Sequence, residues 1–136
     1  MTSKILQVVR MVPAGKVISY GQIAMYTGNP KEAREVGWAM RELGKNHDIP
    51  WWRVINNAGE ISINGNPDAD AKMQRSLLEN EGVKVSEELK VDMDKYRFRL
   101  DAATLKQFGF DDEYIKTAIK KFEPPRQASF FDVLNV

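Results

Sequence analysis

Two adjacent indoles and a guanidinium form the run Trp51-Trp52-Arg53, which follows Pro50 directly. Indole faces stack on nucleobases, and a guanidinium beside them attracts a π system or a phosphate. Core packing is the alternative use of a tryptophan, and we expect it for one of the two indoles. The other indole is then open to either use, so the run is a candidate platform for a planar base.

Nucleophilic and metal chemistry have few candidate residues in this chain. It has no cysteine, which excludes disulfides, thiolate zinc sites and cysteine-based catalysis. Its single histidine, His47, lies in a polar stretch with no second histidine to complete a metal pair or a Ser-His arrangement. We expect His47 to be an ordinary loop residue, and we expect no metal or other cofactor.

A predicted helix over residues 31–43 carries a second set of candidate residues. At helical spacing its cations and one indole fall in one sector, and its apolar residues fall opposite. The first sector contains Lys31, Arg34, Trp38, Arg41 and Lys45, and the second contains Ala33, Val36, Met40 and Leu43. Glu35 and Glu42 border the cations, so a solvated face with i,i+4 ion pairs is one interpretation. The indole favours a contact surface, because a large aromatic among charges leaves apolar area in water.

Local signals predict the helix that precedes this one. Residues 4–11 have amphipathic helical spacing, and residues 16–18 are expected to be extended. Ser19 and Gln22 form a capping-box pattern, which predicts a helix from this point to about Tyr26.

The turn between the two helices is also readable. Gly28 ends the first helix, and we expect Asn29 to cap the second helix with Pro30 as its first residue. Two short helices around a tight turn have the sequence shape of a helix-turn-helix, in which the second helix is presented to nucleic acid.

The rest of the chain alternates short extended and helical segments. We predict extended segments at 53–55 and 60–63 around a turn at 57–59, followed by a loop at 64–70. A helix is expected at 71–80, with Leu77 and Leu78 facing inward and Gly82 at its end. A late strand is expected at 91–100. The pattern predicts an α+β fold of winged-helix type, with residues 1–100 as one domain.

Beyond that domain the sequence becomes helical again. Residues 103–122 have helical character interrupted near Gly109 and closed by Pro124-Pro125, so we expect a small helical appendage over 101–125 and a tail over 126–136. The tail run Gln127-Ala128-Ser129-Phe130-Phe131 resembles the short peptide by which bacterial repair proteins dock on the polymerase sliding clamp, although a tail folded back on its own domain is an equal alternative.

Size and charge limit what the whole chain does. Its 136 residues, 43% hydrophobic and 29% charged, fit one modest core. A net charge of only +1 means that binding to a polyanion depends on local clusters of Lys and Arg. The sequence has no long apolar run, so we expect a monomer in the cytoplasm, associated with the nucleoid, and no contact with a membrane.

Four ordered segments carry a resemblance to a known family. They are residues 15–24, 28–37, 49–56 and 77–82. Together they resemble the DNA alkylguanine alkyltransferases, and within that family the alkyltransferase-like proteins. The resemblance spans roughly residues 4–100 and implies the fold of the transferase C-terminal domain.

The resemblance also implies that the transfer chemistry is lost. The transferases carry a Pro-Cys-His-Arg core, in which the cysteine accepts the alkyl group and the histidine, with a distant glutamate, activates it. In this chain Trp51 stands at the cysteine position, Trp52 at the histidine position, and Glu81 matches the glutamate. The alkyltransferase-like proteins usually keep the histidine, so Trp52 is a departure.

Family roles map onto individual residues of this chain. Arg34 resembles the arginine that enters the base stack from the minor groove, and Tyr20 the tyrosine that crowds the 3′ phosphate. The implied DNA-binding set is Tyr20, Lys31, Ala33, Arg34, Gly37, Trp38 and Arg41, and the implied lesion pocket is Tyr20, Trp51, Trp52, Arg53, Val54, Ile55 and Asn64. Two departures stand out, namely Glu35 on the groove-facing helix and the absence of an arginine near Asn64.

The sequence therefore suggests a reader of O6-alkylguanine in duplex DNA. Such a protein would flip the lesion into a pocket floored by Trp51 and hold it as a marker for nucleotide excision repair proteins, without being an enzyme. Two alternatives remain at this point. One is a sequence-specific helix-turn-helix regulator, and the other is an enzyme that acts on the base.

Overall fold

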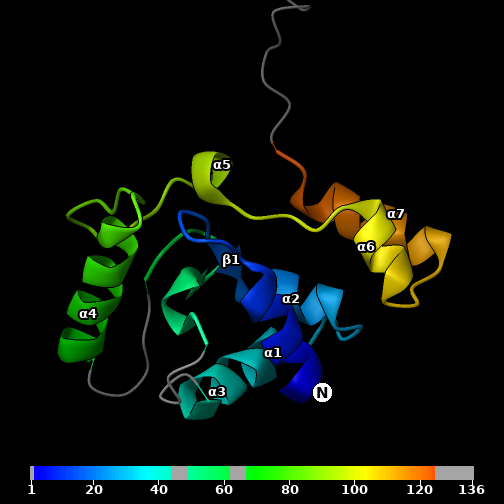
Figure 1. Cartoon of the computed structure of the whole chain (residues 1–136), viewed down its shortest axis with the longest axis horizontal. Coiled ribbons are helices and arrows are strands. Elements are labelled where there is room, and N and C mark those ends of the chain that lie inside the picture. Colours follow the sequence, from blue (N-terminus) through cyan, green and yellow to red (C-terminus); the bar gives the residue numbers. More distant parts are fainter. Residues whose placement is uncertain (1, 44–48, 62–66, 125–136) are drawn as a thin grey trace, which may run out of the picture.

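The computed structural model describes residues 2–43, 49–61 and 67–124 of the 136-residue chain. In chain order the described elements are α1 (Thr2–Met11), β1 (Ile18–Ser19), α2 (Tyr20–Tyr26), α3 (Ala33–Leu43), the 3-10 turn η1 (Trp51–Arg53), β2 (Val54–Ile55), α4 (Pro67–Asn80), α5 (Met93–Tyr96), α6 (Ala102–Gln107) and α7 (Asp112–Phe122) (Figure 1). Helices surround a two-stranded sheet, so the predicted α+β class is confirmed.

The first two helices form where local signals predict them. α1 buries one apolar face, with Ile5, Val8 and Val9 at most 1% exposed. At the start of α2 the Ser19 Oγ accepts a hydrogen bond from the Gln22 backbone N at 3.1 Å, and the Gln22 Oε1 accepts one from the Ser19 N at 3.0 Å. This capping box satisfies two backbone donors that a helix start leaves free, which confirms the prediction.

The start of α3 differs from the prediction. Asn29 does not cap the helix, and Pro30 is not its first residue, because residues 29–32 close a turn of their own in which the Glu32 N donates to the Asn29 O at 2.9 Å. The Asn29 side chain instead donates to the Thr27 O at 3.1 Å. The helix therefore begins at Ala33, three residues after Pro30, and Lys31 lies in the turn before it.

The described sheet contains a pairing that the sequence did not predict. β2 pairs in parallel with β1, with Ile18 opposite Val54 and Ser19 opposite Ile55, and the Asn56 N donates to the Glu60 O at 3.3 Å across the predicted turn. The predicted turn is present, because the Gly59 N donates to the Asn56 O at 3.0 Å. Beyond the turn, Glu60 bridges to Lys90 rather than back to β2. The wing stays a prediction, since residues 62–66 lie outside the described part of the chain.

Two further predictions were wrong in extent or type. The helix α4 begins at Pro67, so residues 67–70 are not loop, while its end at Asn80 and the buried Leu78 agree with expectation. The late strand at 91–100 is absent: Asp92 caps the short helix α5 by accepting from the Asp94 N at 3.0 Å. That cap diverts the chain, and the alternation at 97–100 gives only an extended segment whose single described bridge joins Arg97 to Val17.

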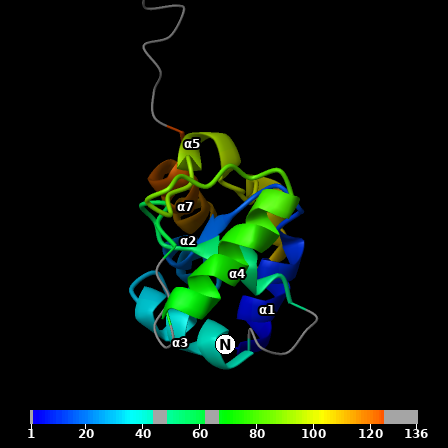
Figure 2. The ribbon, with the colours of Figure 1, turned by 90° about the vertical axis from the view of Figure 1, so that its left-hand side faces the viewer.

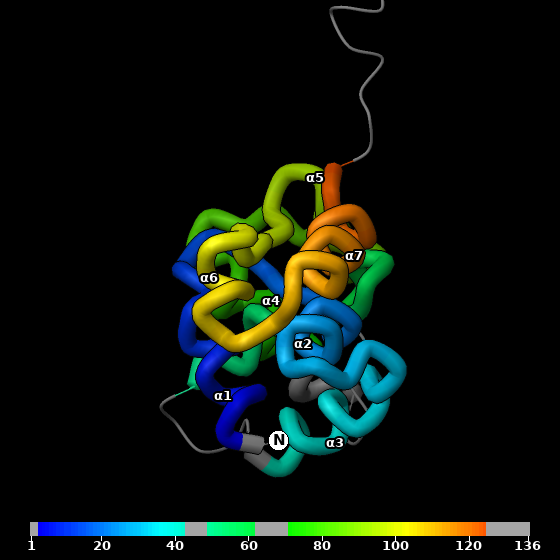
Figure 3. The backbone as a smooth tube through the Cα atoms, turned by 90° about the vertical axis from the view of Figure 1, so that its right-hand side faces the viewer, coloured from blue at the N-terminus to red at the C-terminus, as the bar shows by residue number. Residues whose placement is uncertain are grey.

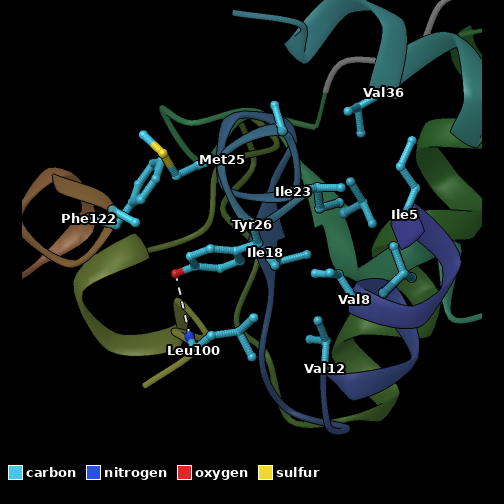
Figure 4. Close-up of a cluster of buried hydrophobic side chains, with 14 of the residues drawn as sticks. Ile5, Val8, Val12, Ile18, Ile23, Met25, Tyr26, Val36, Leu100 and Phe122 are labelled. Carbon is cyan, nitrogen blue, oxygen red and sulfur yellow. Dashed lines mark hydrogen bonds between the residues drawn. The ribbon is translucent and has the colours of Figure 1, made fainter. Parts of the chain in front are cut away.

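The C-terminal segment forms two helices, as predicted, with Gly109 between them at φ 96°. They do not stand apart from the rest of the molecule. Leu105, Ile115 and Phe122 belong to the same buried cluster as residues of α1, α2 and α3, and Figure 4 shows Phe122 beside Tyr26 of α2. The tail over 126–136 lies outside the described residues.

The helices lie on two sides of the molecule. α4 lies on one side and α6 and α7 on the other, which is plain when the two side views are compared (Figures 2 and 3). A second buried cluster, centred on Ile55 and Leu78, packs α4 against β2. Among the described helices, none combines the length and the apolar character that a membrane crossing requires.

Candidate nucleic-acid interface

The two faces of α3 differ as the helical spacing predicts. Val36 and Met40 are buried at 0% and 6% exposure, whereas Arg34 and Arg41 are exposed on the other side. Trp38 is 58% exposed, the highest value among the large hydrophobic residues that the structure describes as exposed. The helix therefore presents an indole between two guanidinium groups, a surface suited to phosphates and base edges.

Ion pairing does not neutralise this face. Between described residues, no salt bridge involves an α3 side chain, because the pairs present are Arg53–Glu81 and Arg75–Glu79. The interpretation of α3 as a face held by its own i,i+4 pairs thus lacks support there. Its guanidinium groups remain available to an anion.

Tyr20 joins the start of α2 to this face. It is half-buried against the main core, and burial raises the pKa of its phenol, while the charge of Arg41 lowers it in part. A phenol with a raised pKa stays protonated at neutral pH and is able to donate a hydrogen bond to a phosphate oxygen.

The two indoles of η1 lie edge to face. Their ring centroids are 6.0 Å apart at an interplanar angle of 87°. Each is half-buried, Trp51 against the main cluster and Trp52 against the second cluster. Both indoles therefore pack partly against buried residues, and each keeps an exposed part.

A carboxylate fixes the second indole. The Trp52 Nε1 donates to the Glu81 Oε2 at 3.0 Å, and the Arg53 Nε donates to both oxygens of Glu81 at 3.0 and 3.1 Å. Burial raises the pKa of Glu81, but the hydrogen bonds from Arg53 and Trp52 and the charge of Arg53 outweigh it, so the pKa lies below its ordinary value. Glu81 is therefore an ionised acceptor at neutral pH.

Arg53 does not line an open pocket in this arrangement. Its Nη2 also binds Glu81, its Nη1 donates to the Val12 O at 2.8 Å, and its guanidinium carbon lies 5.3 Å from the Trp52 ring centroid. These contacts tie η1 to α1 and to the end of α4. Arg53 is an anchor of the site's backbone.

The remaining predicted pocket residues are core or undescribed. Val54 and Ile55 are 2% and 1% exposed, and their side chains pack in the two buried clusters. Only the backbone atoms of these two residues could therefore line a pocket. Asn64 lies outside the described residues, as do Lys45 and His47.

Sequence reasoning missed Gln74, which is 3% exposed. Its Nε2 donates to the Trp52 O and to the Val54 O, both at 3.0 Å, and so fixes the backbone on both sides of Arg53. The signal was present, because Gln74 precedes the inward Leu78 by four residues and therefore shares its helix face. A buried amide on that face calls for backbone partners.

This arrangement presents two partly exposed aromatic rings and no thiol. The chain has no cysteine. An indole N–H only donates hydrogen bonds, so Trp52 cannot take a proton from a neighbouring nucleophile and pass charge to Glu81. The geometry fits recognition through stacking and phosphate contacts.

Comparisons with known proteins also indicate DNA binding. Residues 1–83 match the family described as 6-O-methylguanine DNA methyltransferase, DNA binding domain. A DNA base-flipping protein of Vibrio parahaemolyticus is 42% identical over 96 residues, which cover 71% of this chain and 93% of that protein. Alkyltransferase-like protein 1 of Schizosaccharomyces pombe is 39% identical over 101 residues, covering 71% of this chain and 93% of its own length.

A solved structure is similar over the same extent. It is S. pombe Atl1 in complex with damaged DNA containing O6-carboxymethylguanine, with a TM-score of 0.67, 38% identity, and coverage of 73% of this chain and 94% of that one. The match to the family spans more than half of the chain. The chain therefore belongs to the 6-O-methylguanine DNA methyltransferase family, through its DNA-binding domain.

Proposed function

We propose that this protein recognises O6-alkylguanine in duplex DNA, turns the modified base out of the helix, and holds it without removing the alkyl group. The observation that carries the proposal is the pair of indoles in η1: Trp51 stands where the family nucleophile is expected, beside Trp52, whose only polar hydrogen is already donated to Glu81. The names of its relatives, a base-flipping protein and an alkyltransferase-like protein, support the same function.

In this mechanism the exposed face of α3 enters the minor groove. Arg34 fills the space that the rotated nucleotide leaves, and Tyr20 presses on the neighbouring phosphate. Rotation costs a few kcal/mol, and the cost is lower at a damaged or mispaired base, which gives selectivity before any pocket contact forms. Trp51 then supplies an aromatic surface for the extruded guanine.

The first test is a titration of matched duplexes. Duplexes with and without one O6-methylguanine are titrated at one salt concentration, and we expect tighter binding to the modified one. Arg34→Ala should remove most of this preference. Arg75→Ala, which removes the same charge from a partly exposed position of α4, is the control and should leave the preference unchanged. Equal affinity of the wild-type protein for both duplexes would contradict the proposal.

The absence of catalysis needs its own readout. After long incubation with stoichiometric protein, the modified duplex should keep its methyl group and the protein its mass. A gain of 14 Da on the protein, the size of one methyl group replacing hydrogen, would identify a transferase, where the mass follows from the chemistry of group transfer.

The downstream partner that we propose is nucleotide excision repair, in the cytoplasm at the nucleoid. Incision of an O6-alkylguanine duplex by a purified excision nuclease should become faster when the protein is added. Unmodified duplex provides the control. If the protein slows incision of the modified duplex, it shields the lesion and does not signal it.

We also propose a contact with the sliding clamp through Gln127–Phe131, on the sequence pattern alone, since these residues lie outside the described structure. Deletion of residues 126–136 should abolish binding to purified clamp and leave lesion affinity unchanged. Full clamp binding by the truncated chain would exclude this contact.

A sequence-specific regulator is the second candidate, because α2 and α3 pack as consecutive helices around a tight turn with α3 exposed. Such a regulator reads base edges in the major groove. Selection from random duplexes separates the two functions: a regulator returns a defined motif, and the proposed lesion reader returns none.

A further inference from the structure

The end of α7 lies against the start of α2. The ring of Phe122 is 6.2 Å from that of Tyr26, edge on, and its Cζ lies 4.0 Å from the position that a Cβ on Gly21 would occupy. Gly21 directly follows Tyr20, the proposed phosphate contact. Figure 4 shows Phe122 and Val36 on different sides of α2, so α7 and α3 flank the helix that carries Tyr20.

Three cations gather at Phe122, and we name Arg97, Arg99 and Lys121 the Phe122 cluster. The Arg97 guanidinium carbon lies 5.5 Å from the ring centroid and the Lys121 Nζ 5.7 Å from it. The Arg99 Nε donates to the Phe122 O at 2.6 Å. The face of an aromatic ring attracts cations, so the buried ring holds Arg97 and Lys121, while the backbone carbonyl of the same residue holds Arg99.

Hydrogen bonds fix one member of the cluster to α2 itself. The Arg97 Nη1 donates to the Gln22 Oε1 at 2.8 Å and to the Ser19 Oγ at 3.3 Å, the two side chains of the capping box. Arg97 is thus held at the N-terminal end of α2. Its position relative to Tyr20 is set by the fold and not by a flexible side chain.

In the described part of the chain, the cluster has no acidic side chain as an ion-pair partner. Between described residues, none of its members forms a salt bridge, and the guanidinium groups donate to backbone and neutral oxygens. Burial lowers the pKa of Arg97 and the neighbouring Arg99 lowers it further, with Asp94 acting in the opposite sense. Glu123, the residue after Phe122, is exposed. Like charges held this close repel one another, and an anion would relieve the repulsion.

We propose that the Phe122 cluster is a second phosphate-binding surface, which holds the DNA backbone next to the stretch contacted by Tyr20 and α3. The partner follows from the proposed function, on which this inference rests. The match to the family ends at residue 83, so the surface comes from a part of the chain outside it. With a net charge of only +1, the chain needs such local clusters to bind a polyanion.

The test is the salt dependence of DNA binding. A contact with one phosphate contributes about 0.9 to the slope of log Kobs against log salt concentration. We expect Lys121→Gln to make the slope shallower by about this amount, equally for duplexes with and without O6-methylguanine. The matched control is Lys116→Gln, an exposed lysine of the same helix that is not part of the cluster, which should leave the slope unchanged.

A contact measurement completes the test. Because the chain has no cysteine, Lys121→Cys introduces a single thiol. It should react by thiol–disulfide exchange with a duplex that carries, on a phosphate flanking the lesion, a tether ending in a mixed disulfide with a small thiol; the protein–DNA disulfide forms, the small thiol leaves, and we expect this at one side only. An unchanged slope in Lys121→Gln, an equal change in the Lys116 control, or no cross-link in Lys121→Cys would overturn the inference.

Failure of this inference is distinguishable from failure of the proposed function. The slope is measured on unmodified duplex as well, so it reports the backbone contact whether or not the lesion is preferred. Conversely, the wild-type protein could prefer the lesion while Lys121→Gln leaves the salt slope unchanged and Lys121→Cys gives no cross-link. That result would leave the proposed function intact and exclude only this surface.

Discussion

Glu81 joins three parts of the chain that are far apart in sequence. Its carboxylate accepts hydrogen bonds from the Gly15 N at 3.5 Å, from Trp52 and from Arg53. In transferases of the family, the resemblance gives the matching glutamate a part in activating the nucleophile. Here the same position has become a structural anchor for the site.

The contribution of Glu81 to stability should depend on pH. Glu81→Gln should lower the free energy of unfolding by about 2 kcal/mol at pH 7, because the mostly buried Arg53 loses its counter-ion. The folded pKa of Glu81 is lowered, so this contribution is complete above the unfolded value of about 4.3 and is lost as the pH falls through the folded value.

Urea unfolding of both proteins at pH 7 and pH 3 measures this dependence. Glu79→Gln is the control, because Glu79 pairs with Arg75 at the surface, where its side chain is 47% exposed. That variant should change stability by less than about 0.5 kcal/mol. Equal destabilisation by Glu81→Gln at both pH values would show that the carboxylate charge is not what stabilises the site.

Restoring the thiol alone should not restore transfer. In Trp51→Cys the new thiol has no base beside it, since Trp52 only donates, so we expect no methyl transfer within hours. Trp51→Cys combined with Trp52→His supplies an imidazole next to Glu81, and we expect slow transfer. Protein mass after incubation with O6-methylguanine DNA is the measurement. Equal rates for both variants would mean that Trp52 is irrelevant to the lost chemistry.

At the level of single residues, sequence reasoning found types and positions but not partners. The exposure of Arg34, Trp38 and Arg41 follows from helical spacing alone. The bonds of Arg53 to Glu81 and to the Val12 O depend on how η1, α4 and α1 meet, which no local pattern encodes. The description of Arg53 as a pocket residue therefore missed its use as an anchor.

Among the elements, α3 contains a glycine that helix formation does not favour. Gly37 sits in its interior, and a Cβ there would meet nothing within 4 Å. Glycine in a helix interior costs about 0.5–1 kcal/mol relative to alanine. The residue is thus unfavourable for the free protein, and we propose that close approach of the backbone to DNA is the reason for its presence.

Gly37→Ala should therefore separate stability from binding. We expect the free energy of unfolding to rise by about 0.5–1 kcal/mol and the affinity for duplex DNA to fall several-fold, because the methyl group stands between helix and groove. Urea unfolding and a duplex titration on the same preparation test this. Increased stability with unchanged affinity would place Gly37 away from the DNA.

Element prediction succeeded where the determinants were local. The capping box of Ser19 and Gln22 is a contact within four residues, and α2 begins where it predicts. The parallel pairing of β1 with β2 joins residues 36 positions apart, as in Ile18 with Val54, and no local pattern predicts it. The strand expected at 91–100 gave way to a short helix capped by Asp92, so in this segment a local determinant was missed.

For the molecule as a whole, the C-terminal helices are part of the core. Leu105, Ile115 and Phe122 are at most 6% exposed, and the Tyr114 OH donates to the Met25 O at 2.6 Å. Each buried Leu, Ile or Phe side chain contributes about 1.5–3 kcal/mol. Removal of α6 and α7 would also uncover one side of α2.

A chain ending at Leu100 should accordingly lose stability. We expect its thermal midpoint to fall by more than about 10 °C, or its cooperative transition to disappear. Deletion of residues 126–136 alone controls for chain length and should have a much smaller effect. A midpoint that stays unchanged in the shorter chain would make α6 and α7 dispensable for folding.

The helical character of α6 and α7 could be predicted from the sequence, but the contacts that attach these helices to the core could not. The interruption at Gly109 and the ends of α6 and α7 follow from local signals. The face of α2 that receives Phe122 is set by Tyr26 and by the guanidinium of Arg97, which come from other parts of the chain. A site assembled from such distant residues is not visible in any one window of sequence.

The parallel pair of β1 and β2 has a kinetic consequence. Tyr20 follows β1 directly and Trp51 precedes β2 by three residues, so one hydrogen-bonded ladder sets the spacing between the proposed phosphate contact and the proposed floor. A receptor with its contacts already in place has no rearrangement to complete after encounter. Opening of the base pair should then limit the rate of binding in a stopped-flow experiment. Binding should be faster when the lesion lies opposite thymine or cytosine in a pair that opens readily than when the lesion lies in a firmly stacked context.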